Sequence, residues 1–387
     1  PLGRSAVRTE YDEKGRLKRT LDVEGDSISF SYDPDNATQT VKDANNNPTF
    51  YEYDDRGNVI QQVNALGHIT QLDYEDPNNP TRVTSITDPN GNLTTYHYDE
   101  NGNLRRRSEP HRPGTEPSYT HYGYDENGNQ TSITLPTGAS FKQKYDPRGN
   151  LLQLEDAEGN LIQAFTYDRR GNVTSETDPF GTTSYEDFDA FGNPRLIRDP
   201  DGETTTSTYD TQGRLKTFTD NNGTSEIFYD KSGREIKADY GDGLIVEYDY
   251  EGAGGDWTSL EAPTIGRIER RFTEDGKLGG WLTPGEGEIT FSYNENSQLE
   301  TETDPSGRVT TYSYDPIGRV KTVTDEATGL KTEYHYDHLP EGIADPDPDV
   351  ADHLLGRRSG QTVHLDADRQ YTTATTYYAD GQEMHCL

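Results

Sequence analysis

The chain has little of what usually marks a disulfide-stabilised, membrane-spanning or aliphatic-core protein. It contains one cysteine, Cys386, so no intrachain disulfide framework can form and cysteine content does not indicate a redox compartment. No stretch approaches the roughly 18 consecutive apolar residues of a membrane helix, which argues against membrane insertion. Leu, Ile, Val and Phe together make only 64 of the 387 residues, too few for an ordinary aliphatic core.

Basic residues are also scarce, with 36 Lys and Arg against 70 Asp and Glu and a formal net charge of −34. Such a chain repels a phosphate backbone, so nucleic-acid binding is not expected. Few aliphatic residues combined with high charge are typical of disorder. The 26 tyrosines and many threonines argue against that here, because both residue types favour strands and a tyrosine ring buries a large area.

A short motif, Tyr-Asp followed by two variable residues and Gly, returns at a step of about 21 residues. Eroded copies of the motif fill the gaps between full ones, so sixteen units are expected in all. One element repeated this often cannot bury its own apolar face and must stack on its neighbours. The residues that we assign to this structural motif are Tyr11, Asp12, Gly15, Tyr53, Asp54, Gly57, Tyr98, Asp99, Gly102, Tyr145, Asp146, Gly149, Tyr167, Asp168, Gly171, Tyr209, Asp210, Gly213, Tyr314, Asp315 and Gly318.

Each unit carries two turn signals about ten residues apart, which leaves room for two strands of about five or six residues. The first turn follows the tyrosine, as in Asp146-Pro147-Arg148-Gly149. The second uses the same residue types, as in Asp178-Pro179-Phe180-Gly181. Asp first and Gly fourth are typical of a type I turn closed by a bulge, so each unit is predicted to be one β-hairpin.

The return strand is predicted to begin with Leu or Val six residues after the tyrosine, as at Leu151, where it can pack beside the rings. A second ring often stands two places before the motif tyrosine, and a period of two puts both rings on one sheet face. The predicted fold class is therefore all-β, with antiparallel hairpin repeats of about 21 residues forming a curved or spiral sheet, a partial shell or barrel.

The repeats define the expected organisation of the chain. Residues 1–10 are expected to be a lead-in resembling a cloning remnant, on a piece of a longer protein. Residues 11–338 are the hairpin array of about 16 units. Residues 339–360 form an acidic, proline-containing loop, and residues 361–387 supply residual strands of the array.

The Tyr-Asp-x-x-Gly-[Asn/Arg]-[Leu/Val] copies, interleaved with Asp-Pro-x-Gly turns, resemble the YD repeats of the Rhs family, which also occur in teneurins and in insecticidal toxin complexes. The resemblance is strong from Tyr11 to Tyr336 and weak beyond. In that family the repeats wind into a hollow β-shell, which in bacterial members encloses a variable C-terminal toxin. The Asp325–Leu330 segment is only faintly similar to the family's self-cleavage region, so neither autoproteolysis nor toxin activity is carried over.

The resemblance implies a secreted or cell-surface bacterial protein with a non-catalytic role. Its expected function is that of a shell fragment which, in the full-length protein, encapsulates or presents a C-terminal effector. The expected partners are that effector or the rest of the shell. The alternative is a cell-surface adhesion module that binds glycans or partner proteins, as teneurin-like relatives do. Nucleic acid and membrane insertion are not expected.

Candidate sites outside the repeats are few. Asp345, Asp347, Asp349 and Asp352 alternate on one segment and could hold calcium, although a solvated linker stiffened by prolines explains them better. Paired carboxylates are too widespread to specify a glycosidase, and His335, His338 and His353 lack metal-ligand spacing. Tyr-Asp pairs could bind sugars, but ring packing and turn capping explain both residues. We expect no cofactor apart from that possible calcium, and no enzymatic activity.

Overall fold

The computed structural model describes residues 8–22, 25–241, 243–250, 256–273, 275–341, 357–365, 369–377 and 383–386. Every regular element in this part of the chain is a β-strand, so the predicted all-β class is confirmed. None of the described residues belongs to a helix that could cross a membrane. The candidate calcium ligands Asp345, Asp347, Asp349 and Asp352 lie outside the described residues.

The strands follow one another closely along the sequence. The first strands are β1 (Arg8–Tyr11), β2 (Leu17–Leu21), β3 (Ser27–Asp33), β4 (Thr38–Lys42), β5 (Pro48–Tyr53), β6 (Val59–Val63), β7 (Ile69–Asp73), β8 (Ser85–Thr87), β9 (Leu93–Tyr98), β10 (Leu104–Ser108), β11 (Tyr119–Tyr124) and β12 (Gln130–Thr134). They are followed by β13 (Ser140–Tyr145), β14 (Leu151–Glu155), β15 (Leu161–Tyr167), β16 (Val173–Asp178), β17 (Gly181–Phe188), β18 (Pro194–Arg198), β19 (Thr204–Tyr209), β20 (Leu215–Asp220), β21 (Gly223–Tyr229), β22 (Glu235–Asp239) and β23 (Ile245–Asp249). The last are β24 (Ser259–Ala262), β25 (Gly266–Phe272), β26 (Leu278–Thr283), β27 (Gly287–Tyr293), β28 (Leu299–Thr303), β29 (Val309–Tyr314), β30 (Val320–Asp325), β31 (Leu330–Tyr336), β32 (Arg358–His364), β33 (Gln370–Tyr377) and β34 (Glu383–Cys386).

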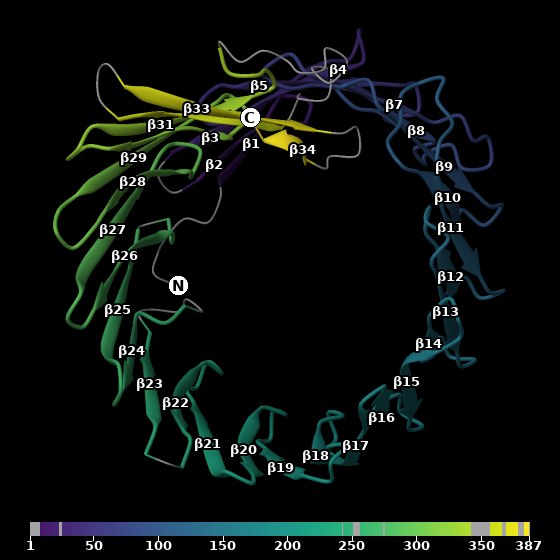
Figure 1. The fold of residues 1–387 in the computed structure, drawn as a ribbon, viewed down its shortest axis with the longest axis vertical. Helices are drawn as coiled ribbons and strands as arrows, with labels where there is room; N and C mark the ends of the chain where they lie inside the picture. Colours follow the sequence, from purple (N-terminus) through teal and green to yellow (C-terminus); the bar gives the residue numbers. More distant parts are fainter. Residues whose placement is uncertain are drawn as a thin grey trace. The chain divides into compact units, whose positions relative to one another are not determined.

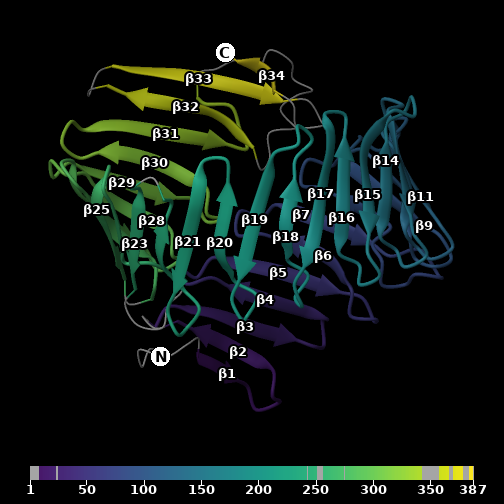
Figure 2. The same ribbon diagram turned by 90° about the horizontal axis from the view of Figure 1, so that it is seen from below.

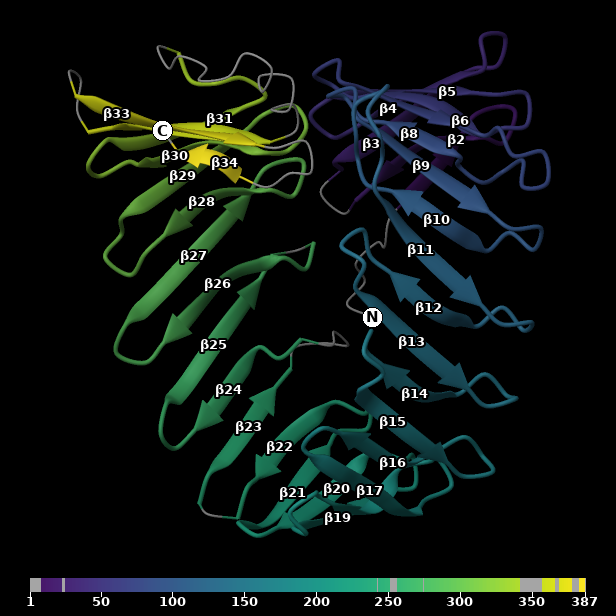
Figure 3. The same ribbon diagram turned by 45° about the vertical axis from the view of Figure 1, so that its right-hand side comes forward.

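The chain divides into two compact units. The first comprises Pro1–Gly102, Arg107–Ser118 and Arg270–Leu387, and the second comprises Asn103–Arg106 and Tyr119–Glu269. In the second unit each strand from β11 to β25 pairs antiparallel with the next, and Figure 2 shows β19, β20 and β21 as successive arrows of alternating direction. In the first unit the same pattern joins β1 through β9 and β26 through β34 (Figure 1 and Figure 3).

Return strands begin where the sequence predicts, for example at Val59, Leu151 and Val320. Near the C-terminus, β32 begins at Arg358, inside the segment 339–360 for which a loop was predicted. Because β32 pairs with β31 and β33, the hairpin pattern resumes before that predicted boundary.

The two faces of the sheet differ in chemistry. Cross-strand pairing aligns Tyr122 with Ile133 and Ile133 with Phe141, so aromatic and aliphatic side chains share one face. On the other face, hydroxyl groups pair across neighbouring strands, as in Thr166 with Ser175 at 2.6 Å. This division follows from the period of two in each strand.

The sheet buries few large apolar side chains. Among the described residues, the buried apolar side chains are the alanines Ala238, Ala262 and Ala374, while Phe50 and Ile69 remain 47% and 45% exposed. A single sheet layer, with no second layer against it among these residues, explains this exposure. Contacts between neighbouring hairpins must therefore supply most of the stability.

The turns are closed by glycines in a left-handed conformation. In the turn Asp168–Gly171, Gly171 has φ +93 and open space where a Cβ would lie. Asn46 (φ 64) and Ser297 (φ 60) occupy the same place in two other turns, so small polar residues are tolerated. The constraint is thus the sign of φ and not lack of space.

We predict that Gly171→Ala lowers the free energy of unfolding by about 1–2 kcal/mol, because an alanine Cβ strains a left-handed residue. Gly171→Asn should lower it clearly less, because asparagine accepts this conformation. Urea denaturation followed by circular dichroism measures both variants. Equal losses for the two substitutions would contradict the conformational explanation.

Candidate functional site

The candidate site is the repeated motif itself, beginning with the turn after the tyrosine. In the Asp146 turn, carboxylate Oδ1 accepts the backbone N–H groups of Arg148 (2.8 Å) and Asn150 (2.9 Å). The side-chain amide of Asn150 donates to Oδ2 at 2.9 Å. The backbone closes the loop, since the Gly149 N–H donates to the Asp146 carbonyl at 3.0 Å. One carboxylate therefore satisfies three donors of its own turn.

The same arrangement recurs in other first turns and in second turns. Asparagine four residues after aspartate donates to Oδ2 in the pairs Asp43/Asn47, Asp54/Asn58, Asp88/Asn92, Asp125/Asn129, Asp156/Asn160, Asp168/Asn172 and Asp189/Asn193. In turns that begin with asparagine, such as Asn64 and Asn294, the amide Oδ1 caps the same two N–H groups. A neutral amide oxygen thus serves at this position as a carboxylate does, so a charge is not essential.

These hydrogen bonds lower the pKa of the capping aspartates. The Asn150 backbone N–H, with its side-chain amide, lowers the pKa of Asp146 to about 2 against the cost of partial desolvation. The pKa values of Asp125 and Asp230 shift in the same direction, through the Asn129 side chain and the Arg234 backbone N–H respectively. Carboxylates of this kind are firmly ionised at neutral pH, so they suit capping and not proton donation.

The motif tyrosines connect each hairpin to the preceding one. The Tyr145 hydroxyl donates to the backbone carbonyl of Gln130 at 2.9 Å, and the Tyr314 hydroxyl donates to that of Leu299 at 2.7 Å. The other tyrosines whose hydroxyl donates to a backbone carbonyl of the preceding hairpin are Tyr74, Tyr98, Tyr167, Tyr209, Tyr229, Tyr250, Tyr293 and Tyr336, at 2.6–3.0 Å. In most cases the acceptor is the first residue of the preceding return strand.

A β-bulge lies beside many of these acceptors. The pairing of β11 with β12 shifts between Gly123 and Tyr124, opposite Gln130, and the same shift recurs at Tyr145 and Tyr314. The bulge is not required for the bond, since Pro194 accepts the Tyr209 hydroxyl where the pairing of β17 with β18 shows no such shift. The hydroxyl is what makes the bond, which favours tyrosine over phenylalanine at this position.

Arginine replaces asparagine in several turns and adds a second link. Arg214 donates to Asp210 in its own turn, and its guanidinium lies 4.5 Å from the ring centre of Tyr229 in the next hairpin. Arg16 over Tyr32, Arg234 over Tyr250 and Arg319 over Tyr336 repeat this contact at 4.3–4.8 Å. Cation–π contact of this kind reinforces the link between hairpins.

The other candidate residues that the structure describes do not form a metal site, and His353 lies outside the described residues. Among the described residues, no group of three or more His, Cys, Asp or Glu side chains is placed to hold a metal ion. His335 contacts the Thr362 hydroxyl at 2.8 Å, and burial lowers its pKa. Asp325 caps its own turn and binds Arg308, which strongly lowers the pKa of its carboxyl. This carboxylate is a turn cap, as the second-turn position of Asp325 in the sequence suggests.

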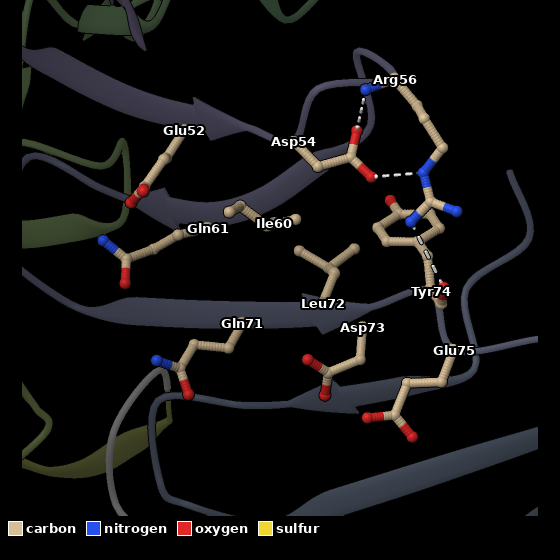
Figure 4. Close-up of a pocket in the computed structure, with 10 residues that line it drawn as sticks. All are labelled: Glu52, Asp54, Arg56, Ile60, Gln61, Gln71, Leu72, Asp73, Tyr74 and Glu75. Atoms are coloured by element: carbon tan, nitrogen blue, oxygen red, sulfur yellow. Dashed lines mark hydrogen bonds and ion pairs between the residues drawn. The ribbon is translucent and has the colours of Figure 1, made fainter. Parts of the chain in front are cut away.

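Surface depressions lie between neighbouring hairpins. One of about 370 Å³ on β6 and β7 is lined by carboxylates that include Glu52, Asp73 and Glu75 (Figure 4). At its rim the Arg56 side chain donates to Asp54 at 3.0 Å, and the Arg56 guanidinium reaches the Tyr74 carbonyl at 3.5 Å. Since the pKa of Asp54 is lowered to about 2, it does not provide the proton donor of a hydrolytic pair.

One half-buried carboxyl group was not anticipated from the sequence. Partial burial raises the pKa of Glu235, which begins β22 where most return strands begin with Leu or Val. Its backbone carbonyl still accepts the Tyr250 hydroxyl at 2.6 Å. The link between hairpins therefore persists with a different side chain at this position.

Comparison with known protein families identifies the type of repeat. Residues 81–111, 145–183, 188–225 and 293–329 match the family model of the RHS repeat, so the resemblance found in the sequence is confirmed. No match was found among curated protein sequences.

Solved structures of toxin complexes share the fold. A TcdB2-TccC3-TEV crystal structure is 16% identical over 97% of this chain and 22% of its own, with a TM-score of 0.72. A TcdB2-TccC3 crystal structure is 17% identical over 97% and 23%, with a TM-score of 0.61. A Tc holotoxin pore of Photorhabdus luminescens with a mutated TccC3 is 17% identical over 98% and 25%, with a TM-score of 0.56. The chain thus spans about a quarter or less of these proteins.

We predict that Tyr145→Phe lowers the free energy of unfolding by about 1 kcal/mol, because the Gln130 carbonyl loses the tyrosine hydroxyl that donates to it.

Phe188→Tyr is the matched variant, which adds such a hydroxyl where the chain has none. Its hydroxyl would stand 15 residues after Val173, the separation that joins Tyr145 to Gln130, and Val173 lies at a similar bulge. We expect Phe188→Tyr to be neutral or to raise the free energy of unfolding by up to about 1 kcal/mol.

Urea denaturation measures both tyrosine variants. Unchanged stability of Tyr145→Phe would contradict the hydroxyl link.

We also predict that the fold loses stability in acid as the capping aspartates protonate. The folded pKa of Asp146, about 2, lies below its ordinary value of about 3.9. Its contribution is therefore fully present above about pH 4 and is lost as the pH falls toward 2. Asp146→Asn, which keeps the oxygen acceptor, should show a shallower fall. Thermal unfolding between pH 2 and pH 7 measures this; an equally steep fall in both proteins would count against the caps.

Proposed function

We propose, from the premise that this chain carries RHS repeats, that it is a non-catalytic scaffold. It forms part of the wall of a β-shell that encapsulates or presents a C-terminal effector polypeptide in the full-length protein. The proposed setting is the cell surface or the secretion of a bacterial toxin-like protein. Its partners are that effector and the rest of the shell.

This proposal rests on one observation: the polar side chains of the repeated motif bind other parts of the array. Asp146 and its counterparts cap turns, and the tyrosine hydroxyls bind the preceding hairpin. Chemistry would require groups held free and with pKa values near the working pH. The motif instead uses its polar groups to hold neighbouring hairpins in register, which is the work of a wall.

The thinness of the sheet supports the same function. The described residues bury only small apolar side chains, so the array extends by adding hairpins and not by enlarging a core. Such a layer can cover a guest polypeptide at little cost in chain length. The likeness in fold to TcdB2-TccC3 structures and to a Tc holotoxin pore supports a place in a toxin assembly.

Engagement of the tyrosines favours a wall over a glycan-binding surface. A sugar-binding platform needs aromatic faces and hydroxyls that are open to ligand. Here an arginine guanidinium lies over each of the Tyr229 and Tyr250 rings, and the hydroxyls of both tyrosines donate to backbone carbonyls. The acidic surface, with a net charge of −34, keeps such a wall soluble.

Proteolysis tests the proposal. The natural gene product that contains this chain would be prepared at full length, with a protease site in its C-terminal polypeptide. We expect cleavage to be at least about tenfold slower than in the same polypeptide produced alone, because access requires opening of the wall. Urea that unfolds the array should abolish the difference. Equal cleavage rates under native conditions would refute encapsulation.

A further inference from the structure

Within the first unit, a turn near the N-terminus contacts a turn 251 residues further along the chain. The side-chain amide of Asn296 donates to Asp43 Oδ2 at 2.8 Å, and Asn296 Oδ1 accepts the backbone N–H of Asn45 at 3.3 Å. Asn296 thus uses both its donor and its acceptor on one turn. The Asp43 carboxylate also accepts the side-chain amide of Asn47, so it serves its own turn and the distant one together.

A second contact lies one repeat further on, where a turn residue meets a carboxylate that the facing turn binds. His68 Nε2 lies 3.9 Å from Asp337 Oδ2, and Arg319 donates two hydrogen bonds to that carboxylate, at 2.8 and 2.6 Å. The three side chains are only 13%, 10% and 17% exposed. The separation of His68 and Arg319 along the chain equals that of Asn45 and Asn296. An Arg–carboxylate pair this well shielded is held more firmly than one on an open surface.

Electrostatics agrees with this alignment one repeat before the first contact. Burial raises the pKa of Asp26, with further effects from nearby charges that include Glu295 and Lys277. Lys277 follows Asp26 in the chain at the separation that joins Asn45 to Asn296.

The two contacts share one register. The turn at residues 43–47 binds the turn at residues 294–298. One repeat further along both rows, His68 lies beside Asp337, the carboxylate that Arg319 of the turn at residues 315–319 binds. Turns of the first row are second turns of their hairpins, and those of the other row are first turns. Both rows advance by one repeat from each turn to the next, so contact at one turn aligns the following pair. A chance approach of two loops would not recur in the same alignment one repeat further on.

We infer that these two rows form a register-specific seam in which the turns at residues 22–68 are a docking surface for the turns at residues 273–319. The partner that this surface fits is a row of polar turns that begin with Thr, Asn or Asp and recur once per repeat. Asn296 and the Arg319–Asp337 pair set the register. The inference goes beyond the proposed function, since the seam would join the two rows whatever the wall encloses.

The chemistry of the turns explains why such rows can dock. A turn tip presents backbone N–H groups that the hairpin ladder does not use. An asparagine side chain can donate and accept at once, so it satisfies a carboxylate and an N–H of the facing turn together. In a strongly acidic chain, Asn296 and Arg319 also avoid a carboxylate-to-carboxylate approach across the seam.

Cross-linking tests the register in the full chain with Cys386→Ser. One variant carries Ala44→Cys and Glu295→Cys, at equivalent positions of facing turns. The mismatched control carries Ala44→Cys and Pro316→Cys, one repeat out of register. With a short thiol cross-linker at low protein concentration, we expect an intramolecular product several-fold more abundant in the matched pair. Equal yields in the two pairs would overturn the seam.

Asn296→Ala and Asn296→Asp test the residue that sets the register. Both should reduce the matched cross-link, and the aspartate variant should reduce it at least as much because it faces Asp43. Asn127→Ala, at the same turn position in the second unit, should leave the matched cross-link unchanged. Circular dichroism confirms that each variant keeps its strands. A matched cross-link that both Asn296 variants leave intact would refute this role for Asn296.

Discussion

The hydrogen bond from a tyrosine hydroxyl to a backbone carbonyl of the preceding hairpin is the interaction on which this structure depends. The sheet has few buried apolar side chains among its described residues, so each hairpin must be tied to the last by specific contacts. The acceptor is usually the first residue of the preceding return strand, as at Gln130. Ring and hydroxyl therefore form one link that is repeated along the array.

Turn capping and charge complete the account. A strongly acidic chain would ordinarily resist compaction, yet many of its aspartates accept hydrogen bonds in turns, as Asp54 and Asp168 do. Arginines such as Arg214 and Arg234 bind the turn aspartate and stack on the next tyrosine, so scarce positive charge is placed where it joins hairpins. A wall built this way can remain soluble while it encloses or presents another polypeptide, which is the function we propose.

Much of this fold could be predicted from the sequence because its signals are local. A hairpin is specified by Asp and Gly at fixed offsets and by a period of two, which is why the start of β14 at Leu151 was predicted correctly. The hydroxyl acceptors could not be predicted, because a carbonyl carries no residue identity; the preference for Tyr over Phe was the available signal. Contacts such as Asn296 with Asp43 join residues 253 apart and depend on how many repeats intervene. The proposed calcium ligands, Asp345 among them, remain a prediction.

Spectrophotometric titration of the tyrosines tests the central claim most directly. Desolvation raises the pKa of Tyr145, Tyr167, Tyr314 and Tyr336, whose hydroxyls bind the preceding hairpin. Their contribution to stability is complete below about pH 10, the ordinary pKa, and is lost as the pH rises through the folded values. The account predicts a distinct class of tyrosines that ionise above pH 10, together with loss of strand signal, and a single ordinary class in urea. A native protein whose tyrosines all ionise together near pH 10 with the sheet intact would contradict it.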